Sequence, residues 1–212
     1  MNKVEQAVIP AVFALAVAAS MPASANWSES SDGDLSGDYL SPTAIALAPN
    51  AGTTVSGTIE GAGQGRSVDL DYFTVHVPSG QNLVALFVRP VTAGGGNAGS
   101  FIGLYQGTTG VNPAGAQSTD ALGYYLFGTA DTDTDILPDL ATFNFLGTNP
   151  SQGFTPPLGT GDYTIWVQEG ASGVFPYVFE LVLQAVPEPP ALVYLGLAGL
   201  GVASRRRSGR KV

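Results

Sequence analysis

Three clusters of aspartates are the best candidates in this sequence for binding a metal ion or taking part in catalysis. They are Asp32, Asp34 and Asp38, then Asp69 and Asp71, then Asp131, Asp133 and Asp135. Hard cations such as Ca2+ bind several carboxylate or carbonyl oxygens on a flexible loop, and alternating aspartates can supply them. We predict calcium as the cation and favour the first and third clusters, because the second borders an expected strand. The alternative is that these aspartates form Asx-turns in solvated loops.

The third cluster begins like an EF-hand loop but does not continue as one. Counted from Asp131, the sixth position is Ile136 instead of glycine, and the twelfth is Thr142 instead of glutamate. An EF-hand is therefore excluded. A calcium site that uses this cluster has to be assembled from loops of different strands.

The residues available for catalysis are few. His76 is the single histidine and the chain has no cysteine, which excludes histidine-rich and thiolate metal sites. No Gly-x-Ser-x-Gly motif accompanies His76, which we expect on the solvent face of a strand. Paired carboxylates of a glycosidase cannot be recognised from sequence spacing. We therefore predict a protein that is not an enzyme, with a secreted hydrolase as the less favoured alternative.

Two aromatic residues are candidates for stacking on sugar rings. By strand alternation, Tyr72 and Trp166 point away from the face that carries Phe73 and Ile165. If that outer face is open to solvent, the two rings form a glycan-binding platform. The alternative is that they pack in the interior, as large aromatic side chains usually do.

The elements that position these side chains are short strands. The chain has 212 residues with 28 Gly and 15 Pro, which lie between β-branched and aromatic runs. Period-2 alternation is clearest in residues 71–77, and the run 83–88 is apolar on both faces, which favours a central strand. We expect an all-β fold, an antiparallel two-sheet sandwich of jelly-roll type over residues 26–184. The predicted strands are 53–59, 71–77, 83–88, 101–105, 122–127, 163–168 and 177–184, with 141–145 as a further candidate.

Charge is distributed unevenly along the chain. The net charge is −9, but residues 26–185 contain fifteen acidic residues and only Arg66 and Arg89 as bases, which gives that segment −13. Nucleic-acid binding needs lysine and arginine to neutralise phosphates. This acidic segment therefore argues against nucleic acid as a partner and favours divalent cations.

The first 25 residues have the features of a signal peptide. An apolar run over residues 7–20 is followed by small residues at Ala23 and Ala25, the positions that a signal peptidase reads. We expect cleavage after Ala25 and a mature chain that begins at Asn26 outside the cytoplasm. The alternative is a buried helix or an uncleaved anchor.

Residues 185–212 form a separate C-terminal tail. Its apolar run, 191–203, would make a helix of about 20 Å, which is short against a hydrocarbon thickness of about 30 Å. The basic residues over 205–211 would stay on the cytoplasmic side. We expect this segment to halt export and to insert in the membrane only transiently.

This tail resembles a known sorting signal. Pro187, Glu188 and Pro189, then the apolar run, then Arg205, Arg206 and Arg207 are similar to the PEP-CTERM signal of Gram-negative bacteria. The resemblance implies processing by the membrane protease-transpeptidase exosortase, with signal peptidase as the other partner during export. It also implies a location at the cell surface or in the exopolysaccharide matrix, with exopolysaccharide as a candidate ligand. An ordinary short anchor after a proline-rich linker is the alternative.

The segment between these ends resembles a second family. The run Asp69 to Val75, the turn Pro78 to Gly80 and the run Pro157 to Val167 are similar to the bacterial pre-peptidase C-terminal domain. That resemblance implies a non-catalytic β-sandwich; the stretches 93–98 and 128–157 depart from its pattern. The sequence thus predicts an exported surface or matrix protein with a structural or adhesive role. The alternative is a carbohydrate- or calcium-binding module.

Overall fold

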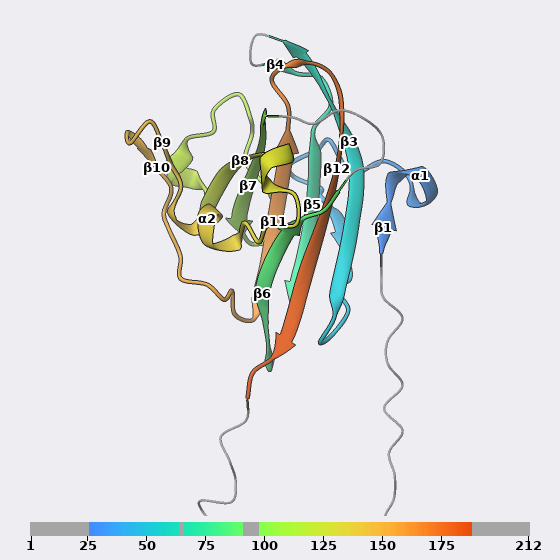
Figure 1. Cartoon of the computed structure of the whole chain (residues 1–212), viewed down its shortest axis with the longest axis vertical. Coiled ribbons are helices and arrows are strands. Elements are labelled where there is room, and N and C mark those ends of the chain that lie inside the picture. Colours follow the sequence, from blue (N-terminus) through green and yellow to red (C-terminus); the bar gives the residue numbers. More distant parts are fainter. Residues whose placement is uncertain (1–25, 64–65, 91–97, 188–212) are drawn as a thin grey trace, which may run out of the picture.

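The computed structural model describes residues 26–63, 66–90 and 98–187 (Figure 1). Two predictions lie outside these residues: the signal peptide with Ala23 and Ala25, and the sorting tail with Glu188, Pro189, Arg205, Arg206 and Arg207. Pro187 is described and exposed. Within the described ranges, no helix is long and apolar enough to cross a membrane.

The described chain is built from two five-stranded sheets and a small hairpin. The first sheet contains β1 (Trp27–Ser28), β3 (Gly52–Gly63), β12 (Ser172–Ala185) and β6 (Gln81–Val88) in that order, with β4 (Arg66–Ser67) paired to β3. The second contains β2 (Thr43–Ile45), β5 (Asp71–Val77), β11 (Gly161–Gln168), β7 (Ala98–Gln106) and β8 (Gly123–Gly128). The hairpin joins β9 (Asn144–Phe145) to β10 (Asn149–Pro150). The helices are α1 (Glu29–Asp32) and α2 (Leu137–Thr142), with 3-10 turns η1 (Ser118–Asp120) and η2 (Thr129–Asp131).

The all-β prediction is confirmed, but the sheets are mixed instead of purely antiparallel. β1 runs parallel to β3, and β2 runs parallel to β5. Both parallel strands come from the N-terminal segment, which adds one short strand to the edge of each sheet. The pairings among the long strands are all antiparallel.

Alternation along the strands decides which side chains form the core. Phe73 and Val75 of β5 share one buried cluster with Phe179 and Leu181 of β12, so both sheets contribute to a single core. Apolar side chains that alternate along a strand lie on one face, and burying that face stabilises the fold. Six of the seven firm strand predictions fall within observed strands, and the seventh, 122–127, begins one residue before β8.

The prediction of a strand over 141–145 is largely wrong. Residues 137–142 form α2, with a proline in its first turn, and only Asn144–Phe145 belong to a strand. Leu137, Leu140 and Ala141 are buried at helical spacing. Burial of this helical face overrides the β-like composition of the segment.

The run 83–88 does not lie in the centre of its sheet. β6 is the last strand of the first sheet, and loop residues cover its free edge through isolated bridges. Leu158 bridges Leu83, and Asp135 bridges Phe87. Later segments of the chain therefore pair with the edge that this strand leaves free.

The N-terminal segment crosses from one sheet to the other. β1 lies on β3, the chain then turns through α1, and β2 joins β5 in the other sheet (Figure 1). Ser36 in the crossing accepts a hydrogen bond from the Tyr72 backbone N–H at 2.8 Å. This crossing brings acidic residues of the N-terminal segment to the beginning of β5.

Candidate functional site

Three carboxylates converge where the N-terminal segment crosses between the sheets. Glu29 is the first residue of α1, Asp34 follows that helix, and Asp71 is the first residue of β5. One oxygen from each lies within 4.8 Å of the others. No other such cluster of three potential ligands occurs among the described residues.

Two of these carboxylates carry a buried oxygen without a partner. Asp71 is fully buried; its Oδ2 accepts a hydrogen bond from the Tyr177 hydroxyl at 2.7 Å, while Oδ1 has no partner among the described residues. Glu29 Oε2 accepts a hydrogen bond from the Thr58 N–H at 2.7 Å, and its Oε1 is likewise buried and unpaired there. A buried polar group without a partner destabilises a protein by about 1 to 3 kcal/mol, so such pairs are rarely kept without a use.

Burial and mutual repulsion raise the pKa values of this cluster. The pKa of Asp71 rises to about 8, mainly because burial disfavours the charged form; the Tyr177 hydroxyl opposes this, and the charges of Glu29, Asp69 and Asp34 add to it. The pKa of Glu29 is also raised, first by burial and then by the charge of Asp34, and the Thr58 hydrogen bonds and the nearby Leu35 backbone N–H oppose this rise. The ion pairs of the described side chains, formed by Arg89 and His76, do not involve this cluster. A bound cation would favour the ionised forms.

The geometry fits a calcium ion. Calcium–oxygen distances are about 2.3 to 2.6 Å, so two ligand oxygens on one ion lie at most about 5 Å apart. The limit of 4.8 Å between the three carboxylates satisfies this condition. The lack of a side chain at Gly57 of β3 leaves space for Glu29 beside Tyr177. A Cβ at this position would lie 2.5 Å from Glu29 Oε1 and 2.7 Å from the Tyr177 hydroxyl.

Asp34 is the one residue of the first predicted cluster that reaches this site. Asp32 Oδ2 instead accepts a hydrogen bond from the Ser28 N–H at 2.8 Å, at the beginning of α1. Asp38 Oδ1 accepts one from the Leu40 N–H at 2.9 Å, which is an Asx-turn. For Asp32 and Asp38 the structure therefore agrees with the alternative, in which aspartate shapes local backbone.

The third predicted cluster is not gathered into a group of ligands. Asp131 Oδ2 accepts a hydrogen bond from the Gly128 N–H at 2.7 Å, and Asp133 Oδ1 pairs with Arg89 at 2.9 Å. Asp135 Oδ1 accepts bonds from the Leu86 and Leu137 N–H groups at 2.9 and 3.0 Å. Each carboxylate holds a different part of the fold, because this segment is not extended: Thr129–Asp131 form the 3-10 turn η2, and Asp133 has a positive φ of 60°.

Sequence reasoning missed Glu29 and ranked Asp71 too low. Asp71 has the same strand parity as Phe73, Val75 and Val77, so alternation already places a carboxylate on the core face. A carboxylate on a face that is otherwise apolar was the sequence signal for a functional group at this position. Glu29 offered no comparable signal, because its approach to Asp71 depends on the crossing of the N-terminal segment.

The prediction that Tyr72 and Trp166 form an exposed stacking platform is wrong. Both point away from the main core as alternation predicts, but they are 0% and 3% exposed. Their rings stack on each other with centroids 5.6 Å apart, and the Tyr72 hydroxyl donates to the Val111 carbonyl at 3.2 Å. Loops that the strand pattern does not describe cover this outer face, with Tyr39 and Ala116 packed against the cluster.

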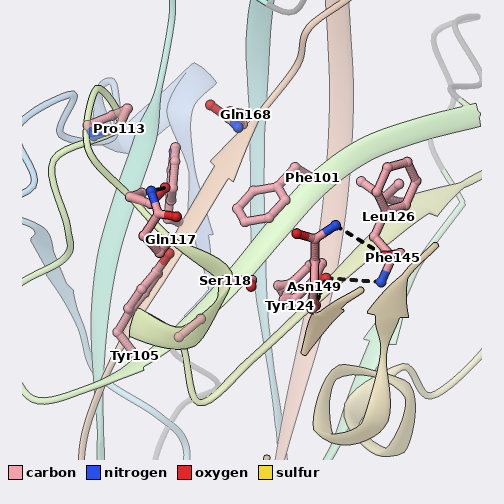
Figure 2. A pocket seen from close by; sticks show the side chains of 13 residues that line it. Phe101, Tyr105, Pro113, Gln117, Ser118, Tyr124, Leu126, Phe145, Asn149 and Gln168 are labelled. Atoms are coloured by element: carbon pink, nitrogen blue, oxygen red, sulfur yellow. Dashed lines mark hydrogen bonds between the residues drawn. The ribbon is translucent and has the colours of Figure 1, made fainter. Parts of the chain in front are cut away.

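A cavity of about 410 Å3 adjoins this aromatic cluster. Its lining includes Phe101 and Trp166 from the second sheet, Gln117 and Ser118 from the covering loop, and Phe145 from the β9–β10 hairpin (Figure 2). Trp166 therefore forms part of a pocket instead of an open platform.

His76 lies on the surface as predicted. Its side chain is 62% exposed, and its Nδ1 lies 2.7 Å from Asp162 Oδ1 on the neighbouring strand β11.

The fold and the site thus define an all-β protein with a convergent acidic cluster. Comparison of the chain with protein families, curated proteins and solved structures finds no match.

Proposed function

We propose that this protein is a non-catalytic β-sandwich domain of the cell surface or exopolysaccharide matrix, in which a calcium ion fastens the N-terminal segment to the sheets. The observation that carries the calcium site is the pair of buried, unpaired oxygens, Asp71 Oδ1 and Glu29 Oε1, beside Asp34. An ion there would join the crossing segment to β5 directly. It would join it to β3 through the Glu29 bond to Thr58.

The proposed extracellular location suits a calcium site of moderate affinity. Extracellular calcium modules bind the ion with dissociation constants of about 10⁻⁴ to 10⁻³ M, so a site that is empty in a calcium-poor compartment fills after export. A ligand that binds only the folded state stabilises it by about 2.7 kcal/mol at one hundred times its dissociation constant. Calcium would thus stabilise the domain where it works.

Export and sorting rest on the two ends of the sequence. The signal-peptide features of residues 1–25 and the resemblance of residues 187–207 to a PEP-CTERM signal support delivery by signal peptidase and exosortase. The shared core of the two sheets supports a sandwich, and the run Asp69 to Val75, which carries the resemblance to the pre-peptidase C-terminal domain, contains Asp71. A structural or adhesive role follows from these features together.

The calcium proposal is tested by thermal unfolding of the full-length chain after treatment with chelator. We expect the melting temperature to rise with Ca2+, to rise less with Mg2+, and to return when chelator is added. Asp71→Asn should abolish the Ca2+ effect, whereas Asp38→Asn, which removes the same charge from the N-terminal segment, should keep it. No response to Ca2+ in the unaltered chain would overturn the proposal.

The sorting proposal needs a separate measurement. We expect the secreted form to begin at Asn26 and to end near Pro187 in cells that contain exosortase. Mass spectrometry of the protein from cells with and without the enzyme determines both ends. An intact C-terminus ending at Val212 in both would contradict sorting of this kind.

A further inference from the structure

The cavity on the outer face of the second sheet has the form of a small-molecule site. Its volume of about 410 Å3 lies within the range of about 300 to 1,000 Å3 that is usual for ligand pockets. Phe101 comes from β7 and Trp166 from β11, while residues before and within η1 and the β9–β10 hairpin form its sides. In Figure 2 the Phe101 ring lies between Gln117 on one side and Asn149 on the other.

Aromatic rings make up the base of this pocket. Phe101 meets Trp166 edge to face, with ring centroids 5.0 Å apart, and stacks on Tyr124 at 6.0 Å. Phe101 remains partly exposed, and Phe145 at the rim is 44% exposed. Partly exposed ring faces fixed by other rings suit a ligand that has a flat apolar face of its own.

Uncharged polar groups surround these rings. Trp166 is 3% exposed, and its Nε1 is buried without a hydrogen-bond partner among the described residues. Within the same part of the chain, the side chains of Ser118 and Gln168 also make no hydrogen bond, although both line the pocket. The indole nitrogen has no surface open to the cavity, so the polar contacts with a ligand fall to the Ser118 and Gln168 side chains.

None of the described residues that line the cavity has a charged side chain. The surrounding segment 26–185 has a net charge of −13, so the absence of carboxylates at this position is not a consequence of composition. Without a cation in its lining, the pocket has nothing to neutralise a phosphate or a uronic acid. The chemistry favours a neutral ligand with many hydroxyl groups and at least one apolar ring face.

The hairpin that closes one side of the pocket is held in place by one hydroxyl. The Tyr124 hydroxyl accepts a hydrogen bond from the Phe145 N–H at 3.0 Å and donates one to the Asn149 carbonyl. The Asn149 amide nitrogen in turn donates to the Phe145 carbonyl at 3.2 Å (Figure 2). Phe145 is therefore positioned by backbone contacts, which lowers the entropy lost when a ligand stacks on it.

We propose that this pocket binds a neutral carbohydrate. A sugar ring packs its C–H face on Phe101 and Phe145, and its hydroxyl groups bond with Ser118 and Gln168. This inference deepens the proposed function, because it gives the extracellular domain a ligand class. Binding itself does not require the calcium site.

The hairpin offers a matched pair of variants. Phe145 lines the pocket, whereas its neighbour Leu146, which is 79% exposed, does not. Both side chains lie at the surface, so neither truncation threatens the fold. Phe145→Ala should weaken sugar binding about three- to tenfold, the range expected for one aromatic stacking partner, while Leu146→Ala should leave it within about twofold.

The test is a titration of the full-length chain that carries Trp27→Phe, so that Trp166 is the single tryptophan reporting by fluorescence. The probes are neutral gluco-, galacto-, manno- and N-acetylglucosamine oligosaccharides, with an oligogalacturonate and an aromatic-rich peptide as competing classes. We expect saturable binding of at least one neutral sugar, with a shift in Trp166 emission and the predicted difference between the hairpin variants. Binding of only the acidic sugar or only the peptide, equal losses in both variants, or no neutral sugar bound would each overturn the inference.

Repeating the titration with Asp71→Asn separates the two proposals. If this variant still binds sugar, the carbohydrate proposal holds even if calcium has no effect on the domain. Calcium stabilisation without sugar binding would leave the acidic site standing and remove the pocket as a carbohydrate site.

Discussion

Tyr177 of β12 donates a hydrogen bond to Oδ2 of Asp71 in β5 at 2.7 Å, between two fully or almost fully buried side chains that belong to different sheets. The bond satisfies one carboxylate oxygen and leaves the other without a partner among the described residues. Burial and the charge of Asp71 raise the pKa of Tyr177 well above its usual value, so loss of the hydroxyl proton is disfavoured. Tyr177 thus orients Asp71 without neutralising it.

The stability of the calcium-free protein should fall as pH rises. The pKa of Asp71 is about 8 in the folded chain against 3.8 for an ordinary aspartate, so between these values the folded state holds a proton that the unfolded state has lost. The contribution of this Asp71 proton to the free energy of unfolding is complete below about pH 4 and is lost as pH rises through about 8. Urea unfolding in chelator from pH 5 to pH 9 measures this trend. A flat or rising profile would show that Asp71 ionises freely in the fold.

Whether Asp71→Asn is more or less stable than the unaltered chain should depend on calcium: more stable in chelator, less stable in saturating Ca2+. In chelator at pH 9, Asp71→Asn should be more stable than the unaltered chain, because an amide accepts the Tyr177 bond without an ionisation penalty. In saturating Ca2+ it should be less stable, because one ligand is missing. Paired thermal melts measure both differences, and the same order in both conditions would argue against a cation at this site.

Alanine at position 57 should block the site without changing its charge. A Cβ there would come within 2.5 Å of Glu29 Oε1 and 2.7 Å of the rigid Tyr177 hydroxyl, so Glu29 must move. We expect Gly57→Ala to weaken Ca2+ binding at least about tenfold, the change that corresponds to about 1.4 kcal/mol. Calorimetric titration gives the affinity. Gly159→Ala, where an added Cβ meets no atom within 4 Å, is the control and should bind as the unaltered chain does.

Arg89 should contribute a salt-dependent part of the stability. Its guanidinium joins Glu180 at 2.6 Å and Asp133 at 2.9 Å and lies 4.3 Å from the centre of the Phe87 ring. Because the pairs are partly exposed, Arg89→Met should lower the free energy of unfolding by only about 1 kcal/mol at low salt. The loss should shrink in 1 M NaCl, where the screening length is about 3 Å. An equal loss at both salt concentrations would assign the effect to packing on Phe87.

The alternation of apolar and polar residues predicted where the strands lie, but it did not predict which strands stand at the edges of the sheets. The alternation of residues 71–77 places Phe73 and Val75 on the core face, because successive side chains of a strand point to opposite sides whatever follows them. The same alternation could not show that β6 ends its sheet or that residues 137–142 prefer a helix. Those outcomes depend on which distant segment covers a face.

The candidate sites divide in the same way. The sequence by itself determined that the protein is all-β and acidic, and that Asp71 stands on a core-facing position while Tyr72 and Trp166 stand on the opposite one. These features follow from residue type and strand period, which are local. Only the tertiary structure decided that Glu29 and Asp34 meet Asp71, and that loops bury Tyr72 and turn the surroundings of Trp166 into a pocket. The reason is physical: contacts between segments far apart in the chain are selected by packing of the whole core, and no short stretch of sequence contains that information.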